Sequence, residues 1–164
     1  MAKTSAGILL FRQRPAGVQV MLVHPGGPFW LKKDEGAWSI PKGLADEDED
    51  VLAAAKREFL EETGAAISGA FIELGAHKES GGKTVVAFGC EGEFDPASLA
   101  SNNFTMEWPP RSGKTAEFPE VDRAGWYFMD EALKKVTKGQ RPIIAALADK
   151  LGVSLSAAPV ARDQ

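Results

Sequence analysis

Residues 43–65 read GLADEDEDVLAAAKREFLEETGA, and the rest of the chain is arranged around this stretch. The part from Asp50 to Thr63 contains no proline or glycine and is rich in residues that favour helices, namely Ala, Leu, Glu, Lys and Arg. Gly64 is a natural C-cap. Candidate N-caps come before the first turn, at Asp46, Asp48 and Asp50. These signals predict a helix over about 50–63.

Three carboxylates crowd the last turns of this helix. Glu58, Glu61 and Glu62 repel one another at such spacing, at a cost of a few tenths of a kcal/mol per pair. An apolar stripe that contains Phe59 should face the core, and Glu58 and Glu62 fall on its edge. A charged side chain in a partly buried position costs free energy unless another charge or hydrogen bonds compensate it. A bound Mg²⁺ or Mn²⁺ ion would compensate it, since both prefer oxygen ligands. The alternative is an ordinary solvated helix face.

The spacing of the fixed residues favours the metal site. The stretch resembles the Nudix box, whose pattern is G-x5-E-x7-R-E-U-x-E-E-x-G-U with U a bulky aliphatic residue. The matching positions are Gly43, Glu49, Arg57, Glu58, Glu61, Glu62 and Gly64. Two positions depart from the pattern, because Phe59 is aromatic and Ala65 is small.

The resemblance to Nudix hydrolases implies roles for these residues. Glu58 and Glu62 are expected to bind Mg²⁺, for which Mn²⁺ can substitute. Glu61 is expected to be a further ligand or to bind the metal through water, and Gly43 to add its backbone carbonyl. Arg57 and Glu49 are expected to form an ion pair that orients the site. Together with an acid from outside the box, the catalytic group is expected to comprise Glu61, Glu62 and Arg57.

The family often supplies that further acid from a loop shortly before a tryptophan-bearing strand. In FPEVDRAGW, Glu120 comes six residues before Trp126, and it is the candidate for a metal-water ligand or a general base. Glu117 and Asp122 are its rivals. An exposed loop acid with no catalytic role is the alternative.

Two residues just before the box are candidate substrate contacts. The segment WSIPKG, residues 38–43, resembles the one that precedes the box in diadenosine polyphosphate hydrolases and their bacterial relatives. Lys42 is expected to contact a phosphate. Trp38 is expected either to contact the substrate or to pack under the box helix. Further aromatic candidates for base stacking are Phe29, Trp30, Phe104 and Trp108. His24 ends an apolar strand and is expected to be structural.

The alternation of strand and helix signals predicts an α+β fold. Strands are expected at 5–13, 18–24, 67–74, 76–79, 83–93, 104–108 and 124–129, with a short extended piece at 38–40 and a basic loop at 109–116. Further helices are expected at 131–136, capped by Asp130, and at 141–151. The Nudix resemblance sharpens this to an α/β/α sandwich, a mixed sheet between helices.

Composition sets the wider limits. The 164 residues suit one domain, expected over 1–153, followed by a flexible tail at 154–164. A net charge of −4 argues against a general nucleic-acid binder. A lone cysteine, Cys90, cannot form an internal disulfide, and the sequence contains no stretch that suits a signal peptide or a membrane span. We therefore expect a cytoplasmic protein with a small-molecule nucleotide as its partner; the oligomeric state stays open.

Nudix enzymes hydrolyse the pyrophosphate bond of a nucleoside diphosphate linked to another group. The resemblance therefore implies a Mg²⁺-dependent pyrophosphohydrolase. A dinucleoside polyphosphate is the leading substrate and a nucleoside triphosphate the next. Removal of pyrophosphate from the 5′ end of RNA is a related alternative. A nucleotide sensor without activity is the alternative of another class, disfavoured because all four box glutamates are present.

Overall fold

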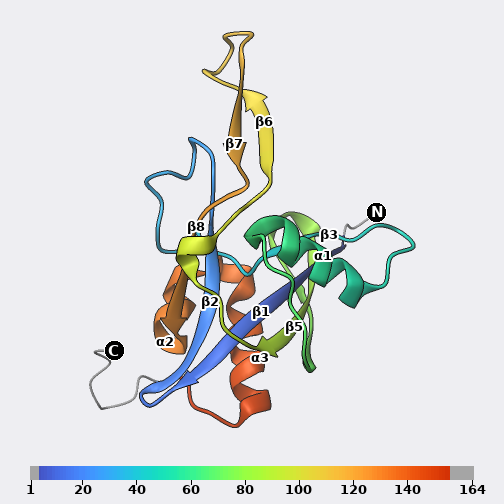
Figure 1. Ribbon diagram of the computed structural model, residues 1–164, viewed down its shortest axis with the longest axis vertical. Helices are drawn as coiled ribbons and strands as arrows, with labels where there is room; N and C mark the ends of the chain where they lie inside the picture. The colour runs from blue at the N-terminus through green and yellow to red at the C-terminus, as the bar shows by residue number, and fades with distance from the viewer. Residues whose placement is uncertain (1–3, 156–164) are drawn as a thin grey trace.

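The hairpin at the N-terminus sets up a mixed sheet. In the computed structural model, which describes residues 4–155, β1 (Thr4–Arg14) pairs antiparallel with β2 (Gly17–Pro25), and both lie close to the strands predicted at 5–13 and 18–24 (Figure 1). The sheet has six strands, in the order β4-β5-β1-β2-β8 with β3 paired to β1. The other strands are β3 (Lys42–Leu44), β4 (Phe71–Lys78), β5 (Thr84–Glu91) and β8 (Val121–Phe128). β1 and β5 are parallel, and the remaining pairs are antiparallel.

One edge of β1 pairs with two different strands. Phe11 to Arg14 pair with β2, whereas Ser5 to Gly7 pair with β3. The chain from Trp38 to Leu44 lies in the opening between β1 and β2, where Ser39 bridges to Val23 of β2. The predicted extended piece at 38–40 is thereby confirmed, and Lys42 and Gly43 come to lie within the sheet.

Helices cover both faces of the sheet, which confirms the predicted fold class. The helices are α1 (Val51–Thr63), α2 (Met129–Lys135) and α3 (Arg141–Leu151), with short 3₁₀ turns at Ser80–Gly82, Pro96–Ser98 and Lys138–Gln140. On β1, Ile8 and Leu10 pack with Phe59 of α1, and Leu9 and Phe11 pack in the second cluster with α2 and α3. This alternation follows from the two-residue period of a strand.

The strand β7 (Thr115–Pro119) was not expected, because its first two residues were assigned to the basic loop at 109–116 and no element was expected at 117–119. It pairs with β6 (Asn103–Glu107) in a separate two-stranded ribbon, which projects from the body of the molecule (Figure 1). The ring of Trp108, next to β6, packs edge-on against Phe29 at 5.5 Å between centroids. Pairing with β6 and partial burial of Phe118 stabilise a segment whose local sequence is unremarkable for a strand.

Other predicted boundaries differ from the structure. Phe128, not Asp130, is the N-cap of α2, so Asp130 lies in the first turn, where its charge suits the helix dipole. β4 begins at Phe71, and residues 67–70 form no strand. Of the predicted tail, residues 156–164 lie outside the described part of the chain. Within residues 4–155, no helix is both long and apolar enough to span a membrane.

Candidate active site

Helix α1 holds the box carboxylates by burying the residue between them. Phe59 is fully buried against β1 and β5, so its neighbours emerge at the margin of the core. The helix begins where the Asp50 carboxylate accepts a hydrogen bond from the Ala53 amide at 3.0 Å, and Gly64 ends it in the left-handed conformation. The predicted helix and both of its caps are confirmed.

Gly43 lets β3 approach this helix closely. A Cβ atom at position 43 would overlap the carboxylate of Glu58, so any other residue would displace that side chain. Burial and then repulsion from Glu61 raise the pKa of Glu58. The carboxylate of Glu58 on α1 therefore occupies the space next to Gly43 of β3, which is free because glycine has no side chain.

Glu62 lies deepest of the box carboxylates. Its Oε1 accepts a hydrogen bond from the backbone amide of Lys42 at 3.3 Å. Burial raises the pKa of Glu62 to about 8, and repulsion from Glu120 and Glu58 acts in the same direction. Negative charge at this position is therefore undercompensated by the protein groups around it.

Arg57 connects the predicted partner Glu49 to the site. Its guanidinium donates two hydrogen bonds to the Glu49 carboxylate, at 2.8 and 2.9 Å, and one to the Leu44 carbonyl at 3.0 Å. Nη1 also donates to Glu58 at 2.8 Å and to Glu61 at 3.2 Å. The pair lowers the pKa of Glu49 to about 2. The predicted ion pair is thus present, and one cation orients three glutamates.

A run of backbone hydrogen bonds brings Glu120 to the same place. The Asn102 amide donates to the Glu61 carbonyl at 2.9 Å, and the Glu120 amide donates to the Asn102 carbonyl at 2.8 Å. The Gly26 amide then donates to the Glu120 carbonyl at 2.9 Å. Gly26 is required there, since a Cβ atom would overlap the carbonyl of Pro119. Burial and repulsion from Glu61 raise the pKa of the Glu120 carboxyl.

The two rival acids lie elsewhere. Glu117 is exposed on β7, opposite Thr105 of the ribbon. The carboxylate of Asp122 is engaged with the ring of His24, at 2.8 Å between Oδ1 and Nδ1. Of the three candidates outside the box, the structure brings Glu120 to the box carboxylates.

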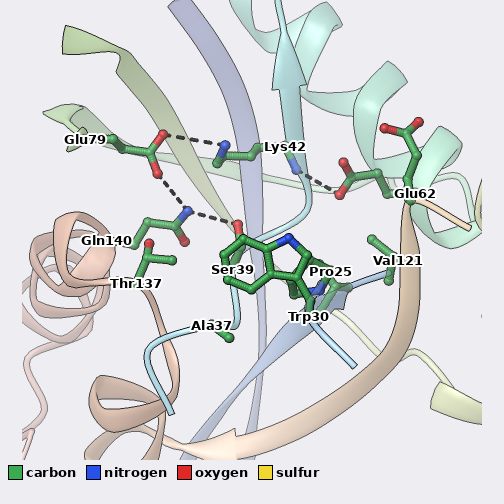
Figure 2. A pocket seen from close by; sticks show the side chains of 12 residues that line it. Pro25, Trp30, Ala37, Ser39, Lys42, Glu62, Glu79, Val121, Thr137 and Gln140 are labelled. Atoms are coloured by element: carbon green, nitrogen blue, oxygen red, sulfur yellow. Dashed lines mark hydrogen bonds and ion pairs between the residues drawn. The ribbon is translucent and has the colours of Figure 1, made fainter. Parts of the chain in front are cut away.

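A cavity of about 260 Å³ opens beside Glu62 and Glu120 (Figure 2). It is assembled from segments far apart in the sequence: the end of β2, the connection to β3 with the first residue of β3, the last turn of α1, the residue after β4, the start of β8, and the segment between α2 and α3. Its walls are both polar and apolar, as is usual for a small-molecule site. The lining residues are Val23, Pro25, Trp30, Ala37, Ser39, Lys42, Glu62, Glu79, Glu120, Val121, Thr137 and Gln140.

Lys42 reaches into this cavity and meets a carboxylate there. Its Nζ lies 3.5 Å from Oε1 of Glu79, while the other oxygen of Glu79 accepts a hydrogen bond from Gln140 at 3.0 Å. The buried Gln140 amide also donates to Ser39 and accepts from the Ile40 amide, each at 2.9 Å. Figure 2 shows Glu79 between Lys42 and Gln140, with Gln140 continuing to Ser39 and the Lys42 backbone amide bonded to Glu62.

Trp38 lies behind the wall of the cavity. Only 3% of it is exposed, and it packs in the cluster with α2 and α3, so the predicted place under the box helix is wrong. Its Nε1 donates to Asp34 at 2.8 Å. Direct substrate contact by Trp38 is therefore not supported by this geometry. The tryptophan that lines the cavity is Trp30, which is 44% exposed.

Sequence reasoning missed two polar residues of the cavity, Glu79 and Gln140. Neither belongs to a motif: Glu79 follows β4, and Gln140 ends a short 3₁₀ turn before α3. Both reach the cavity through tertiary packing alone, so no local signal could have identified them.

The described carboxylates fit a divalent cation in type and charge. Glu58, Glu61, Glu62 and Glu120 gather oxygen donors whose mutual repulsion a cation would relieve, and the Gly43 position leaves space for the Glu58 carboxylate. Among residues 4–155, however, no three acidic, histidine or cysteine side chains stand close enough to form a finished metal cage. Arg57 holds Glu58 and Glu61, so a cation would have to compete with its guanidinium for them.

Comparison with known proteins identifies similar chains. The family model for the NUDIX domain matches residues 1–147. The RNA pyrophosphohydrolase of Caulobacter vibrioides is 42% identical over 57 residues, which are 32% of this chain and 33% of the relative. This match therefore spans about a third of the length of the curated relative.

Solved structures share the fold over most of the chain. The Ap4A hydrolase of C. elegans, in a binary complex, superposes with a TM-score of 0.61 at 17% identity and covers 92% of this chain and 98% of its own. The NUDIX domain of Shewanella oneidensis NrtR, complexed with ADP ribose, gives a TM-score of 0.58 at 16% identity and covers 92% and 89%. At these identities the likeness concerns the fold.

The raised pKa of Glu62 predicts a pH dependence of the metal-free protein. Between about pH 4.5 and about pH 8 the unfolded chain releases the Glu62 proton and the folded chain retains it. The free energy of unfolding should therefore fall as the pH rises through this window, by roughly 2–4 kcal/mol. The low pKa of Glu49 has the opposite effect on stability, but only between about pH 2 and the ordinary glutamate pKa of 4.5.

Urea unfolding at a series of pH values, with a chelator present, measures this dependence. Glu62→Gln should flatten much of the slope and leave the part due to Glu58 and Glu120. Added Mg²⁺ should stabilise the wild type more at pH 8 than at pH 5, since it binds the ionised carboxylates. A slope that is the same in wild type and variant would contradict the assignment.

Proposed function

The chain belongs to the Nudix family, and we propose that it is a divalent-metal-dependent hydrolase of pyrophosphate bonds in nucleotides. The leading substrate is a dinucleoside polyphosphate, and a nucleoside triphosphate is the next. Mg²⁺ is the proposed metal, and Mn²⁺ can substitute for it. The proposed functional unit is a single domain over residues 1–153.

One observation carries this proposal: carboxylates that repel one another gather beside a cavity, where Glu62 and Glu120 line the wall and Glu58 lies next to them. Burial and repulsion raise the pKa values of Glu58, Glu62 and Glu120 together. Such clustering is typical of functional sites. Repulsion among these carboxylates lowers the stability of the fold, so a purely structural role does not account for the cluster.

The box residues would hold the cation. Glu58 and Glu62 are the principal proposed ligands, with Glu61 and the Gly43 carbonyl as further ones. When bound, the cation neutralises phosphate charge and lowers the pKa of a water molecule. Glu120 is the proposed acceptor of a proton from the attacking water, because it lines the cavity beside Glu62 and burial raises its pKa, which makes the carboxylate a stronger base. Arg57 orients Glu58 and Glu61 through the hydrogen bonds already described.

The other groups of the cavity would bind the substrate. The Lys42 ammonium can exchange its contact with Glu79 for a phosphate oxygen, since the pair is long at 3.5 Å and lies at the cavity surface. The exposed indole of Trp30 offers a stacking face for a base. At about 260 Å³ the cavity is smaller than the usual range of about 300–1,000 Å³ for drug-sized ligands, so most of a dinucleotide would lie outside it.

A second candidate is removal of pyrophosphate from the 5′ end of RNA. It is favoured by the 42% identity over 57 residues to a protein named RNA pyrophosphohydrolase. The net charge of −4 favours small nucleotides over RNA, because RNA binding generally relies on positive charge.

Product analysis over a substrate panel with Mg²⁺ separates these candidates. The panel contains diadenosine tetraphosphate, common and oxidised nucleoside triphosphates, ADP-ribose and 5′-triphosphorylated RNA. We expect the fastest turnover with the dinucleotide, which yields ATP and AMP. Faster release of pyrophosphate from RNA would favour the second candidate. Nucleotide binding with no turnover of any member would contradict catalysis and favour a sensor.

Glu62→Gln should lower kcat on the order of 1,000-fold, since it removes the charge of a proposed ligand and keeps the side-chain shape. The measurement is steady-state kinetics at saturating Mg²⁺. Glu131→Gln is the matched control, because it makes the same change at an exposed position of α2. Full activity in Glu62→Gln would refute the ligand assignment.

Glu120→Gln should lower kcat less, by about 10- to 100-fold, because water molecules around the cation can replace part of its function. Glu117→Gln, on the exposed side of the ribbon, should keep wild-type kinetics. The reverse result, with Glu117→Gln inactive and Glu120→Gln unaffected, would identify Glu117 as the acid outside the box.

A further inference from the structure

His24 is a fully buried polar residue beside the cavity that the proposed chemistry does not use. It is the last residue but one of β2, and its ring stands edge-on to Trp38 at 5.2 Å between centroids. Nδ1 lies 2.8 Å from Oδ1 of Asp122, and Nε2 lies 2.6 Å from the carbonyl oxygen of Lys33. Both nitrogens of the ring therefore have partners, and each partner belongs to a different segment.

These two contacts join three segments that line the cavity. His24 lies between Val23 and Pro25 of β2, which form part of the wall. Lys33 lies in the connection from β2 to β3, which contributes Trp30. Asp122 is in β8, two residues after Glu120. The His24 ring thus connects the segment of Trp30, the proposed stacking residue, to the strand that follows Glu120, the proposed base.

The contact with Asp122 spans an irregularity in the sheet. The pairing of β2 with β8 shifts register between His24 and Pro25, beside the backbone hydrogen bond from Gly26 to Glu120. A register shift interrupts the regular backbone hydrogen bonding between β2 and β8. The contact between His24 and Asp122 therefore connects the two strands where their backbone pairing is irregular. Arg123 is a further and weaker partner of Asp122, at 3.6 Å.

The hydrogen-bond pattern also constrains the pair chemically. A carbonyl oxygen can only accept, so Nε2 of His24 must carry a hydrogen. The short contact to Asp122 then needs one further hydrogen, on Nδ1 or on the carboxyl group. An asparagine at 122 could supply that hydrogen from its amide group and keep both bonds with a neutral ring.

We propose that His24 is a positioning residue for the reaction, acting through Asp122 on Glu120 and through Lys33 on the Trp30 segment. It touches neither the substrate nor the reacting atoms. The proposal rests on the proposed function for its kinetic consequences. Loss of the pair should lower kcat, because Glu120 shifts, and should raise KM, because Trp30 shifts. A displacement of about 1 Å can cost on the order of 100-fold in rate.

The test compares His24→Ala, Asp122→Ala and Asp122→Asn with His77→Ala. The control removes the other histidine, whose ring contacts the Leu74 carbonyl at 2.8 Å away from the cavity wall. Both alanine variants at the pair should lose on the order of 100-fold in kcat/KM, with changes in both kcat and KM. The double alanine variant should be no worse than either single one. Asp122→Asn should keep activity within about threefold, as should His77→Ala.

Hydrogen exchange of the metal-free protein gives a readout that needs no activity. In the alanine variants, protection should fall in residues 26–37 and 119–123 and stay unchanged in β4 and β5. If wild type turns over no member of the panel, the proposed function fails while this measurement still tests the pair. If His24→Ala does not fold, Asp122→Ala decides, since its side chain is partly exposed. Uniform loss of protection, unchanged kinetics in Asp122→Ala, or no rescue in Asp122→Asn would each overturn the proposal.

Discussion

A single edge of β1 pairs with two different strands, and the position of the candidate site depends on this division. β2 leaves β1 after a short pairing, and the chain before α1 enters the opening. Lys42 and Gly43 therefore face the last turns of α1 from within the sheet. The same opening places Ser39 and Lys42 in the wall of the cavity.

The site concentrates negative charge that the surrounding protein balances only in part. Arg57 lies at the outer side and engages Glu49, Glu58 and Glu61. Glu62 accepts a long backbone hydrogen bond from Lys42, and the Lys42 charge lowers the pKa of Glu62 less than burial raises it. Charge compensation is therefore uneven, strongest toward solvent and weakest toward the cavity. A protein that folded only for stability would show the reverse order, because uncompensated charge costs most where water is excluded.

What could be predicted from the sequence follows the range of the interactions involved. The helix of the box, its caps and the Arg57–Glu49 pair depend on residues within a few turns of one another, and they were predicted correctly. Glu120 was identified only by its distance from a tryptophan, and its place depends on backbone contacts with Asn102 and Gly26.

The remaining features had no local signal. β7 forms because β6 lies beside it, although its own sequence reads as a loop. Glu79, Gln140 and the His24–Asp122 pair enter the site through contacts across 60 to 100 residues of sequence. Trp38 illustrates the same limit, since its sequence context pointed to the substrate and its packing turned it to the other face of the sheet.

The ribbon of β6 and β7 is closed at its base. Asn103 pairs with Pro119, and the Asn102 carbonyl accepts the Glu120 amide, so the two ends of the excursion are tied together before Glu120 is reached. The place of Glu120 is thereby independent of how far the ribbon extends. The tip of the ribbon, residues 109–113, can therefore change in length during evolution without moving Glu120. For the same reason, it is a site where a peptide can be inserted without disturbing the carboxylates of the candidate site.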